Sequence, residues 1–136
     1  MSGPRPQGNY RTVTEAGGLV FTAGITPRVQ GRLRFTGVIG ADLDLETARA
    51  AADLCARGAV AALDGHGVER VVKMTVHLVC APGFTDHARV ADAASDAVVE
   101  LLGQDAVGVR TTVGVASLPG GAPVEIDLVA VGGRPA

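Results

Sequence analysis

The sequence contains little lysine, few aromatic side chains and few cysteines. Lys73 is the only lysine among 136 residues, and there are one tyrosine, three phenylalanines and no tryptophan. The formal net charge is −2, whereas proteins that bind nucleic acid usually present a basic face. We therefore expect no nucleic-acid partner. Because 47% of the residues are hydrophobic and only 3% are aromatic, the core must consist of Ala, Val and Leu side chains.

Long apolar segments are absent as well. No run approaches the ~18 residues that a membrane-spanning helix needs. The first six residues, MSGPRP, lack the apolar stretch of a signal peptide. We therefore expect a cytoplasmic protein that has no membrane partner. The two cysteines, Cys55 and Cys80, indicate free thiols in a reducing compartment, although the sequence also permits a disulfide.

The length predicts one domain. Residues 1–9 are rich in proline and glycine and predict a flexible arm, which leaves residues 10–136 for the domain. A short strand is expected at Tyr10–Glu15. The apolar run Leu19–Ala23 predicts a second short strand, which is buried. The segment Arg28–Arg34 predicts an exposed hairpin around a glycine.

Two helices follow from capping residues and small-residue spacing. Asp44 is a good N-cap for a helix that runs to about Leu63 and has Glu46 in its first turn. A second helix is expected from about Asp86 to Leu102, ended by a glycine. Their inward residues are mostly small, which allows close packing on a sheet: Ala51, Leu54, Cys55, Gly58 and Ala62 in the first helix, and Ala91, Ala94, Ser95, Val98 and Leu102 in the second.

Between the helices, Val71–Cys80 predicts a long strand. Its apolar face comprises Val72, Met74, Val76 and Leu78, and its other face Lys73, Thr75 and His77. The element order β-β-β-α-β-α-β-β predicts an α+β fold, with one mixed sheet and both helices on the same face. The uncovered face would carry Thr75, His77, Glu125 and Asp127, and such a semi-polar face predicts a homo-oligomer, most simply a cyclic one.

The last thirty residues predict two further strands around a Gly-Gly turn, Arg110–Leu118 and Pro123–Val131. If they pair as a hairpin, Arg110 and Glu125 lie on one sheet face. An arginine fork and a carboxylate suit a small anionic substrate. The two residues would nevertheless lie roughly 20 Å apart along the hairpin. A shared site therefore requires different subunits or a bulge that shifts the register.

The segment from Arg110 to Glu125 resembles a signature of the RidA/YjgF family, also called L-PSP endoribonucleases. It is most similar to the subgroup with R-[ST]-x-V-G-V-A-S-L-P-x-x-A-x-V-E-[IV]. The resemblance extends from about Tyr10 to Val131. Further matching segments are Val20–Gly24, Ala51–Ala56, Val71–Thr75, Ala81–Asp86 and Ala94–Asp96.

This resemblance implies a chorismate-mutase-like homotrimer, in which three sheets pack around a central core and ligands bind in clefts between subunits. It implies hydrolysis of small 2-imino or 2-enamino acids to 2-oxo acids and ammonia. No metal and no cofactor is implied. The expected partner is therefore a small metabolite that bears a carboxylate.

The resemblance also assigns site residues. Arg110 matches the arginine that grips the substrate carboxylate, and Glu125 matches the glutamate that positions the hydrolytic water. Tyr10 matches a tyrosine that lines the cleft, and Gly24 a glycine whose backbone meets the substrate. Substrate contacts are also expected from the matched positions Phe21, Ala23 and Thr112.

At several of these positions the chain differs from many members. Ala23 stands where many have serine, and Thr112 where many have cysteine. Arg11 and Thr12 follow the tyrosine where deaminating members often carry Ser and Gln.

Other interpretations remain open on the residues alone. Arg110 also fits a structural ion pair at a subunit interface, for example with Asp127, and Glu125 also fits an exposed strand carboxylate. Three further arginines, Arg28, Arg32 and Arg34, fit a solvated hairpin better than a phosphate site, and His66, His77 and His87 lack metal-ligand spacing. The functional alternatives are a non-catalytic sensor of a small carboxylate and a pathway-specific enzyme of specialised metabolism. The net charge disfavours a ribonuclease.

Overall fold

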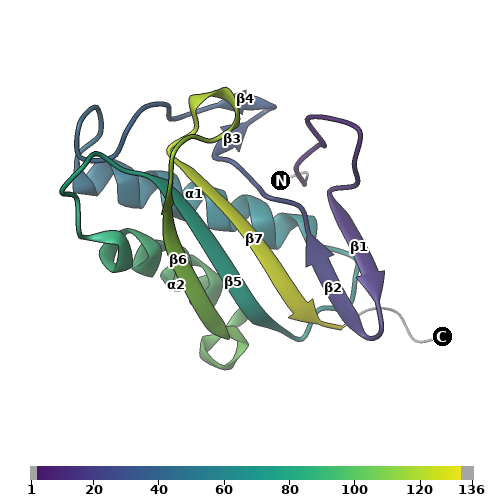
Figure 1. Cartoon of the computed structure of the whole chain (residues 1–136). Coiled ribbons are helices and arrows are strands. Elements are labelled where there is room, and N and C mark those ends of the chain that lie inside the picture. Colours follow the sequence, from purple (N-terminus) through teal and green to yellow (C-terminus); the bar gives the residue numbers. More distant parts are fainter. Residues whose placement is uncertain (1–2, 133–136) are drawn as a thin grey trace.

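Alternating apolar side chains place five strands in one mixed sheet, and two helices cover one side of it (Figure 1). The structure is a computed structural model that describes residues 3–132. The strand order is β1-β2-β7-β5-β6, with a separate β3–β4 hairpin. The bounds are β1 Val13–Ala16, β2 Leu19–Thr22, β3 Arg28–Val29, β4 Arg32–Leu33, α1 Leu45–Ala62, β5 Arg70–Val79, α2 His87–Leu102, β6 Val109–Val115 and β7 Val124–Val131.

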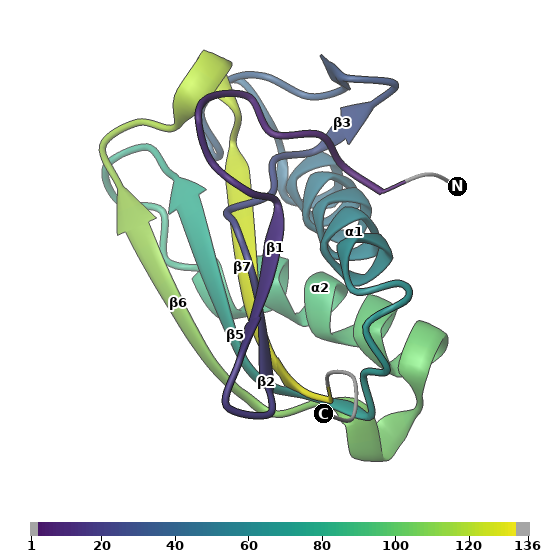
Figure 2. The same cartoon turned by 90° about the vertical axis from the view of Figure 1, so that its right-hand side faces the viewer.

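Both helices form as the sequence predicts. Asp44 caps α1, and its carboxylate accepts a hydrogen bond of 2.8 Å from the Thr47 amide. Gly103 caps α2. Viewed edge-on, the strands and the helices form two layers (Figure 2). The helices bury mainly alanines against the sheet and each other: Ala48, Ala51, Ala52, Cys55, Ala56, Ala59 and Ala62 of α1, and Val90, Ala91, Ala93, Ala94, Ala97 and Val98 of α2.

Details of four predicted elements are wrong. The first strand begins at Val13, so Tyr10 lies in the preceding loop, and in β2 only Val20 is buried. Leu54 of α1 is only partly buried. In β5, a bulge between Val71 and Lys73 shifts the register, so that Val71 enters the core in place of Val72.

The last two strands do not form the predicted hairpin. β6 pairs in parallel with β5, and β7 lies on the other side of β5, antiparallel to both β2 and β5. The reason is α2, which packs on the sheet and returns the chain for a parallel strand. The α+β fold with both helices on one face is confirmed, whereas the pairing of β6 with β7 is wrong.

The predicted arm, residues 1–9, and the predicted domain, residues 10–136, each extend beyond the described residues. Residues 1–2 and 133–136 are not among them. Residues 3–12 contain no helix or strand. Within residues 3–132, no helix is both long and apolar enough to cross a membrane.

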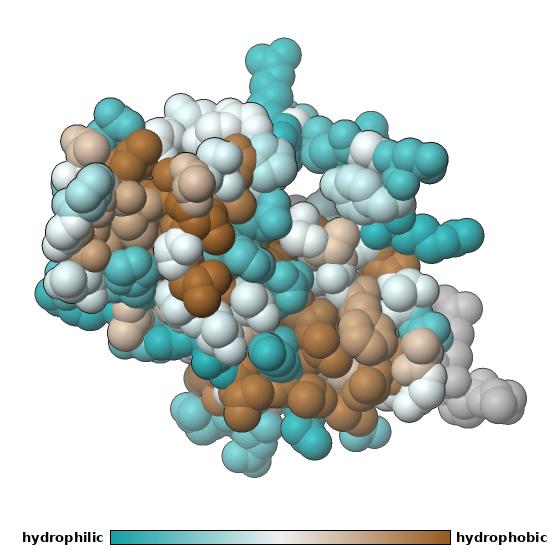
Figure 3. Space-filling model, viewed as in Figure 1, coloured by the Kyte–Doolittle hydropathy of each residue, from teal (hydrophilic) through white to brown (hydrophobic). Residues whose placement is uncertain are grey.

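The sheet face opposite the helices is open. Figure 3 shows it from this side, with apolar patches interrupted by polar side chains. Register places Thr75 beside Asp127 and His77 beside Glu125 on this face, as the sequence predicts. Apolar side chains of β6 join them, and Val109 and Val113 are 67% and 39% exposed. The open face is therefore mixed in character, with carboxylates among exposed valines.

The pH dependence of stability should report on Asp127. Burial raises the pKa of its carboxyl above the ordinary value of 3.8, although His77 and Lys73 act in the opposite direction. The folded chain therefore favours the protonated form, and stability is lost as the pH rises from the unfolded-state pKa through the folded-state pKa. We expect Asp127→Asn to raise the melting temperature at pH 7 by a few degrees.

Thermal melts between about pH 3 and pH 7 measure this effect. The gain should vanish at acidic pH, where the carboxyl is protonated in both the folded and the unfolded chain. Asp96→Asn, at an exposed position of α2, is the matched control. A melting temperature of Asp127→Asn at pH 7 that is equal to or below that of wild type would contradict the prediction.

Candidate functional site

Arg110 lies on the helix-covered side of the sheet edge. It pairs in register with the buried Met74 of β5, so its side chain points toward α2. Its Nη1 donates hydrogen bonds of 2.9 Å to Asp92 Oδ1 and of 2.9 Å to Ser95 Oγ. The arginine side chain is 23% exposed and that of Asp92 is 57% exposed. Within this chain the ion pair of Arg110 is therefore with Asp92, and Asp127 faces the other way. A pairing with Asp127 across a subunit interface remains a prediction.

Thr112 lies two residues further along β6, on the same face as Arg110. Its hydroxyl oxygen is buried and has no hydrogen-bond partner, and within residues 3–132 the same is true of the Thr12 hydroxyl. A buried unpaired hydroxyl costs about 1–3 kcal/mol. The Thr112 hydroxyl is therefore an unpaired polar group on the same sheet face as Arg110. We call Arg110, Thr112, Asp92 and Ser95 the Arg110 half-site.

Glu125 lies on the open face, against the backbone of Gly24. A Cβ added at Gly24 would lie 2.4 Å from Glu125 Oε1, so only glycine allows this approach. The next residue along, Ile25, fixes the segment to β7 through backbone hydrogen bonds of 2.7 Å and 2.9 Å with Ile126. The Glu125 carboxylate makes no hydrogen bond or ion pair with any residue between 3 and 132. It is therefore available to a water molecule or a ligand.

His77 flanks Glu125 on the open face. Its Nδ1 lies 3.1 Å from the Glu125 backbone carbonyl oxygen, which can only accept, so Nδ1 carries the proton. Nε2 is then free to accept or to donate, depending on the charge of the ring. The imidazole therefore adds a second polar side chain beside the carboxylate. We call Gly24, His77 and Glu125 the Glu125 half-site.

The other predicted contact residues lie near the Glu125 half-site along the chain. Phe21 pairs with Val129 on the open face, and the Ala23 amide donates a hydrogen bond of 2.7 Å to the Thr12 carbonyl. Tyr10 is 47% exposed in the loop that leads to Thr12, and its hydroxyl accepts a hydrogen bond from the Gln7 amide. The structure brings Gly24 and Glu125 into contact but leaves Tyr10 at the surface.

The two half-sites cannot meet within one chain. Arg110 pairs with Met74 and Glu125 with His77, three residues apart on β5, so their side chains lie on opposite faces. Their Cα atoms lie two strand spacings apart across the sheet and three residues apart along the strands, which is about 10 Å in each of these two directions. The expectation that both residues share a sheet face is wrong. A single small ligand can touch both only if two copies of the chain contribute to one site.

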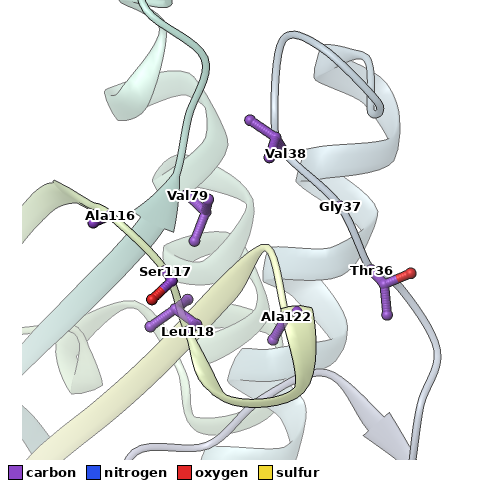
Figure 4. Close-up of a pocket in the computed structure, with 9 residues that line it drawn as sticks. Thr36, Gly37, Val38, Val79, Ala116, Ser117, Leu118 and Ala122 are labelled. Atoms are coloured by element: carbon purple, nitrogen blue, oxygen red, sulfur yellow. The ribbon is translucent and has the colours of Figure 1, made fainter.

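A cavity of about 250 Å³ lies above the end of the sheet, between loop 36–38 and loop 116–122 (Figure 4). Its lining is almost entirely apolar and includes Val38, Val79 and Leu118. Val79 lies two residues beyond His77 on the open face. The cavity therefore lies close to the Glu125 half-site and offers room for a short apolar group. A second cavity, of about 410 Å³, lies near the ends of the helices and contains none of the predicted site residues.

Sequence reasoning missed Asp92, Ser95 and His77 as parts of the half-sites. The first two are separated by three residues, so they share a helix face, and this spacing was the available signal. His77 was predicted on the uncovered sheet face, but it was not connected with Glu125. No group of three or more His, Cys, Asp or Glu within residues 3–132 could hold a metal ion.

Both cysteines are free thiols, which excludes a disulfide between them. Cys55 lies behind the Glu125 half-site. Its Sγ lies 2.6 Å from the Ile25 carbonyl oxygen, and burial raises the pKa of its thiol far above the ordinary range. A thiol in this state is a poor nucleophile. Cys55 therefore contacts the backbone beside Gly24 and is poorly suited to act as a nucleophile.

A family model, a curated protein and solved structures each match most of this chain. Residues 1–132 match the family model described as Endoribonuclease L-PSP. Protein TCP17 of Trypanosoma cruzi is 36% identical over 129 residues, which are 90% of this chain and 80% of that protein. The crystal structure of Atu1372 from Agrobacterium tumefaciens, described as having unknown function, is 34% identical with a TM-score of 0.88, over 95% of this chain and 86% of that one. The YjgF gene product of Escherichia coli is 24% identical with a TM-score of 0.69, over 96% and 93%.

Proposed function

Because the chain belongs to the Endoribonuclease L-PSP family, the RidA/YjgF family that its sequence resembles, we propose that it hydrolyses small 2-imino or 2-enamino acids at sites formed between copies of itself. The family resemblance is confirmed, whereas the subgroup signature remains a prediction. A homotrimer is the assembly that we propose, since it pairs each Arg110 half-site with a Glu125 half-site of the next copy in a closed ring.

The free carboxylate of Glu125 is the observation that carries this proposal. A carboxylate held against a glycine backbone and bonded to no neighbouring group is suited to orient and deprotonate water. In the reaction, this water adds to the C=N carbon of the protonated imine. Glu125 takes one proton of this water and passes it to the nitrogen. The hydroxyl group of the adduct then loses its proton as the C=O bond forms and the C–N bond breaks, and the departing ammonia takes up that proton. The products are one 2-oxo acid and one ammonium ion.

Arg110 supplies the opposite charge in this proposal. Its guanidinium binds the substrate carboxylate through a planar fork and so places the C=N carbon near the water. The apolar cavity beside Val79 and Leu118 would take a short aliphatic side chain. A small apolar 2-imino acid is therefore the substrate class that we propose.

The family description names an endoribonuclease, but the charge of this chain does not support RNA as the substrate. Binding to a phosphate backbone depends on lysine and arginine contacts. This chain has one lysine and a net charge of −2.

A competition assay tests the proposal. An amino-acid oxidase generates a 2-imino acid in the presence of semicarbazide, which traps the imine as a semicarbazone. We expect the wild-type protein to reduce semicarbazone formation, and Glu125→Gln to lose this effect by about 100-fold or more. If several amino acids show no competition while calorimetry detects binding of a 2-oxo acid, the protein is a non-catalytic binding protein and the hydrolase proposal is wrong.

A further inference from the structure

One nitrogen of the Arg110 guanidinium has both of its hydrogens in use. Nη1 donates to Asp92 Oδ1 and to Ser95 Oγ, both at 2.9 Å. A guanidinium Nη carries two hydrogens, so these two bonds saturate Nη1. Among residues 3–132, neither Nε nor Nη2 of Arg110 has a hydrogen-bond acceptor. Three N–H donors therefore remain for a ligand.

The remaining donors contain one parallel pair. The guanidinium is planar, so the hydrogen of Nε and the nearer hydrogen of Nη2 point in the same direction, spaced to match the two oxygens of a carboxylate. The other forked edge, formed by Nη1 and Nη2, is blocked because Nη1 is occupied. We propose that Asp92 and Ser95 are positioning residues that orient Arg110 to bind the substrate carboxylate through Nε and Nη2. This inference rests on the proposed function.

The placement of the two acceptors supports this role. Asp92 and Ser95 are three residues apart on α2, so they lie on one face of the helix and reach the same nitrogen. The two bonds hold the end of a long side chain that otherwise has many rotamers. An arginine fixed in advance loses less conformational entropy when a ligand binds. Asp92 and Ser95 should therefore affect the affinity for a carboxylate more than the rate of the chemical step.

A different role for Asp92 predicts the opposite sign. If its carboxylate competed with the substrate for the guanidinium, removing it would strengthen ligand binding. If the pair were only structural, removing it would lower the melting temperature and leave carboxylate affinity unchanged. The sign and the ligand dependence of the effect separate the three roles.

The experiment measures the Kd of 2-oxobutyrate by calorimetry, together with KM and kcat in the competition assay. We expect Asp92→Ala to raise the Kd and KM about tenfold and to change kcat less than about twofold, because ordering a free arginine side chain on binding costs up to about this factor. Ser95→Ala should raise the Kd by a smaller factor. Asp92→Asn keeps an acceptor oxygen and should stay within about threefold of wild type.

Two controls complete the design. The methyl ester of 2-oxobutyrate lacks the carboxylate, so its affinity should be the same for wild type and Asp92→Ala. Asp53→Ala removes a similar exposed partner of an arginine, Arg57 on α1, and should leave the Kd unchanged. A 2-oxobutyrate Kd that is unchanged or lowered in Asp92→Ala overturns the inference alone. A wild-type protein that binds no 2-oxo acid overturns the proposed function, and this inference with it.

Discussion

Mixing Arg110→Ala with Glu125→Gln protomers should restore activity that neither variant has alone. In one chain the two side chains lie on opposite sheet faces, since the residues with which they pair on β5 are three apart. A working site then needs the arginine of one copy and the glutamate of the next. In a trimer assembled at random from equal amounts, about one site in four combines both wild-type residues. We expect co-refolded mixtures to show about a quarter of wild-type activity.

The matched control mixes Arg110→Ala with the double variant Arg110→Ala/Glu125→Gln. No arginine is then present at any site, so no activity should return although the same subunits exchange. Native mass spectrometry with one variant carrying a mass tag confirms that mixed oligomers form. Mixed oligomers without recovered activity would show that the two residues do not share an intersubunit site.

Local pattern predicted the elements of this fold more reliably than their pairing. Asp44 and the spacing of small residues locate α1 because capping and helical period depend on neighbours along the chain. Alternation locates β5 for the same reason. The bulge between Val71 and Lys73 shows where this reasoning fails. One extra residue in a strand changes which sheet face the side chains on one side of the bulge point to, so Val71 is buried in place of Val72.

Pairing of the last strands depends on contacts far apart in the sequence. Gly120 and Gly121 indicate a turn, but they do not fix which strands lie side by side. A stronger signal was the helix between β5 and β6, because a strand-helix-strand unit requires parallel pairing and leaves β7 to pair elsewhere. The parallel pairing also makes the observed site differ from the predicted one. It turns the Arg110 side chain toward α2, where it bonds to Asp92 and Ser95. These contacts depend on how α2 lies over the sheet edge, which the sequence alone did not define.

Gly24→Ala should abolish most of the activity while leaving the fold intact. The added Cβ would lie 2.4 Å from Glu125 Oε1 and 2.6 Å from its Cδ, so the carboxylate must swing away. Gly24 is not among the residues with a positive φ, so alanine fits its backbone. Displacing a general base costs about 100-fold in kcat, whereas an unstrained glycine-to-alanine change costs little stability.

The measurement compares the change in kcat with the change in ligand affinity. The carboxylate of the ligand binds to Arg110, which comes from the other copy in the proposed site, so the Kd of 2-oxobutyrate should change by a much smaller factor than kcat in Gly24→Ala. Gly58→Ala is the control, because its Cβ would lie 3.2 Å from Ile25 Cγ2 in the same region without meeting Glu125. It should keep wild-type kcat. A Gly24→Ala protein that melts like wild type and retains full kcat would show that the position of the Glu125 carboxylate does not matter, which would remove the general base from the mechanism.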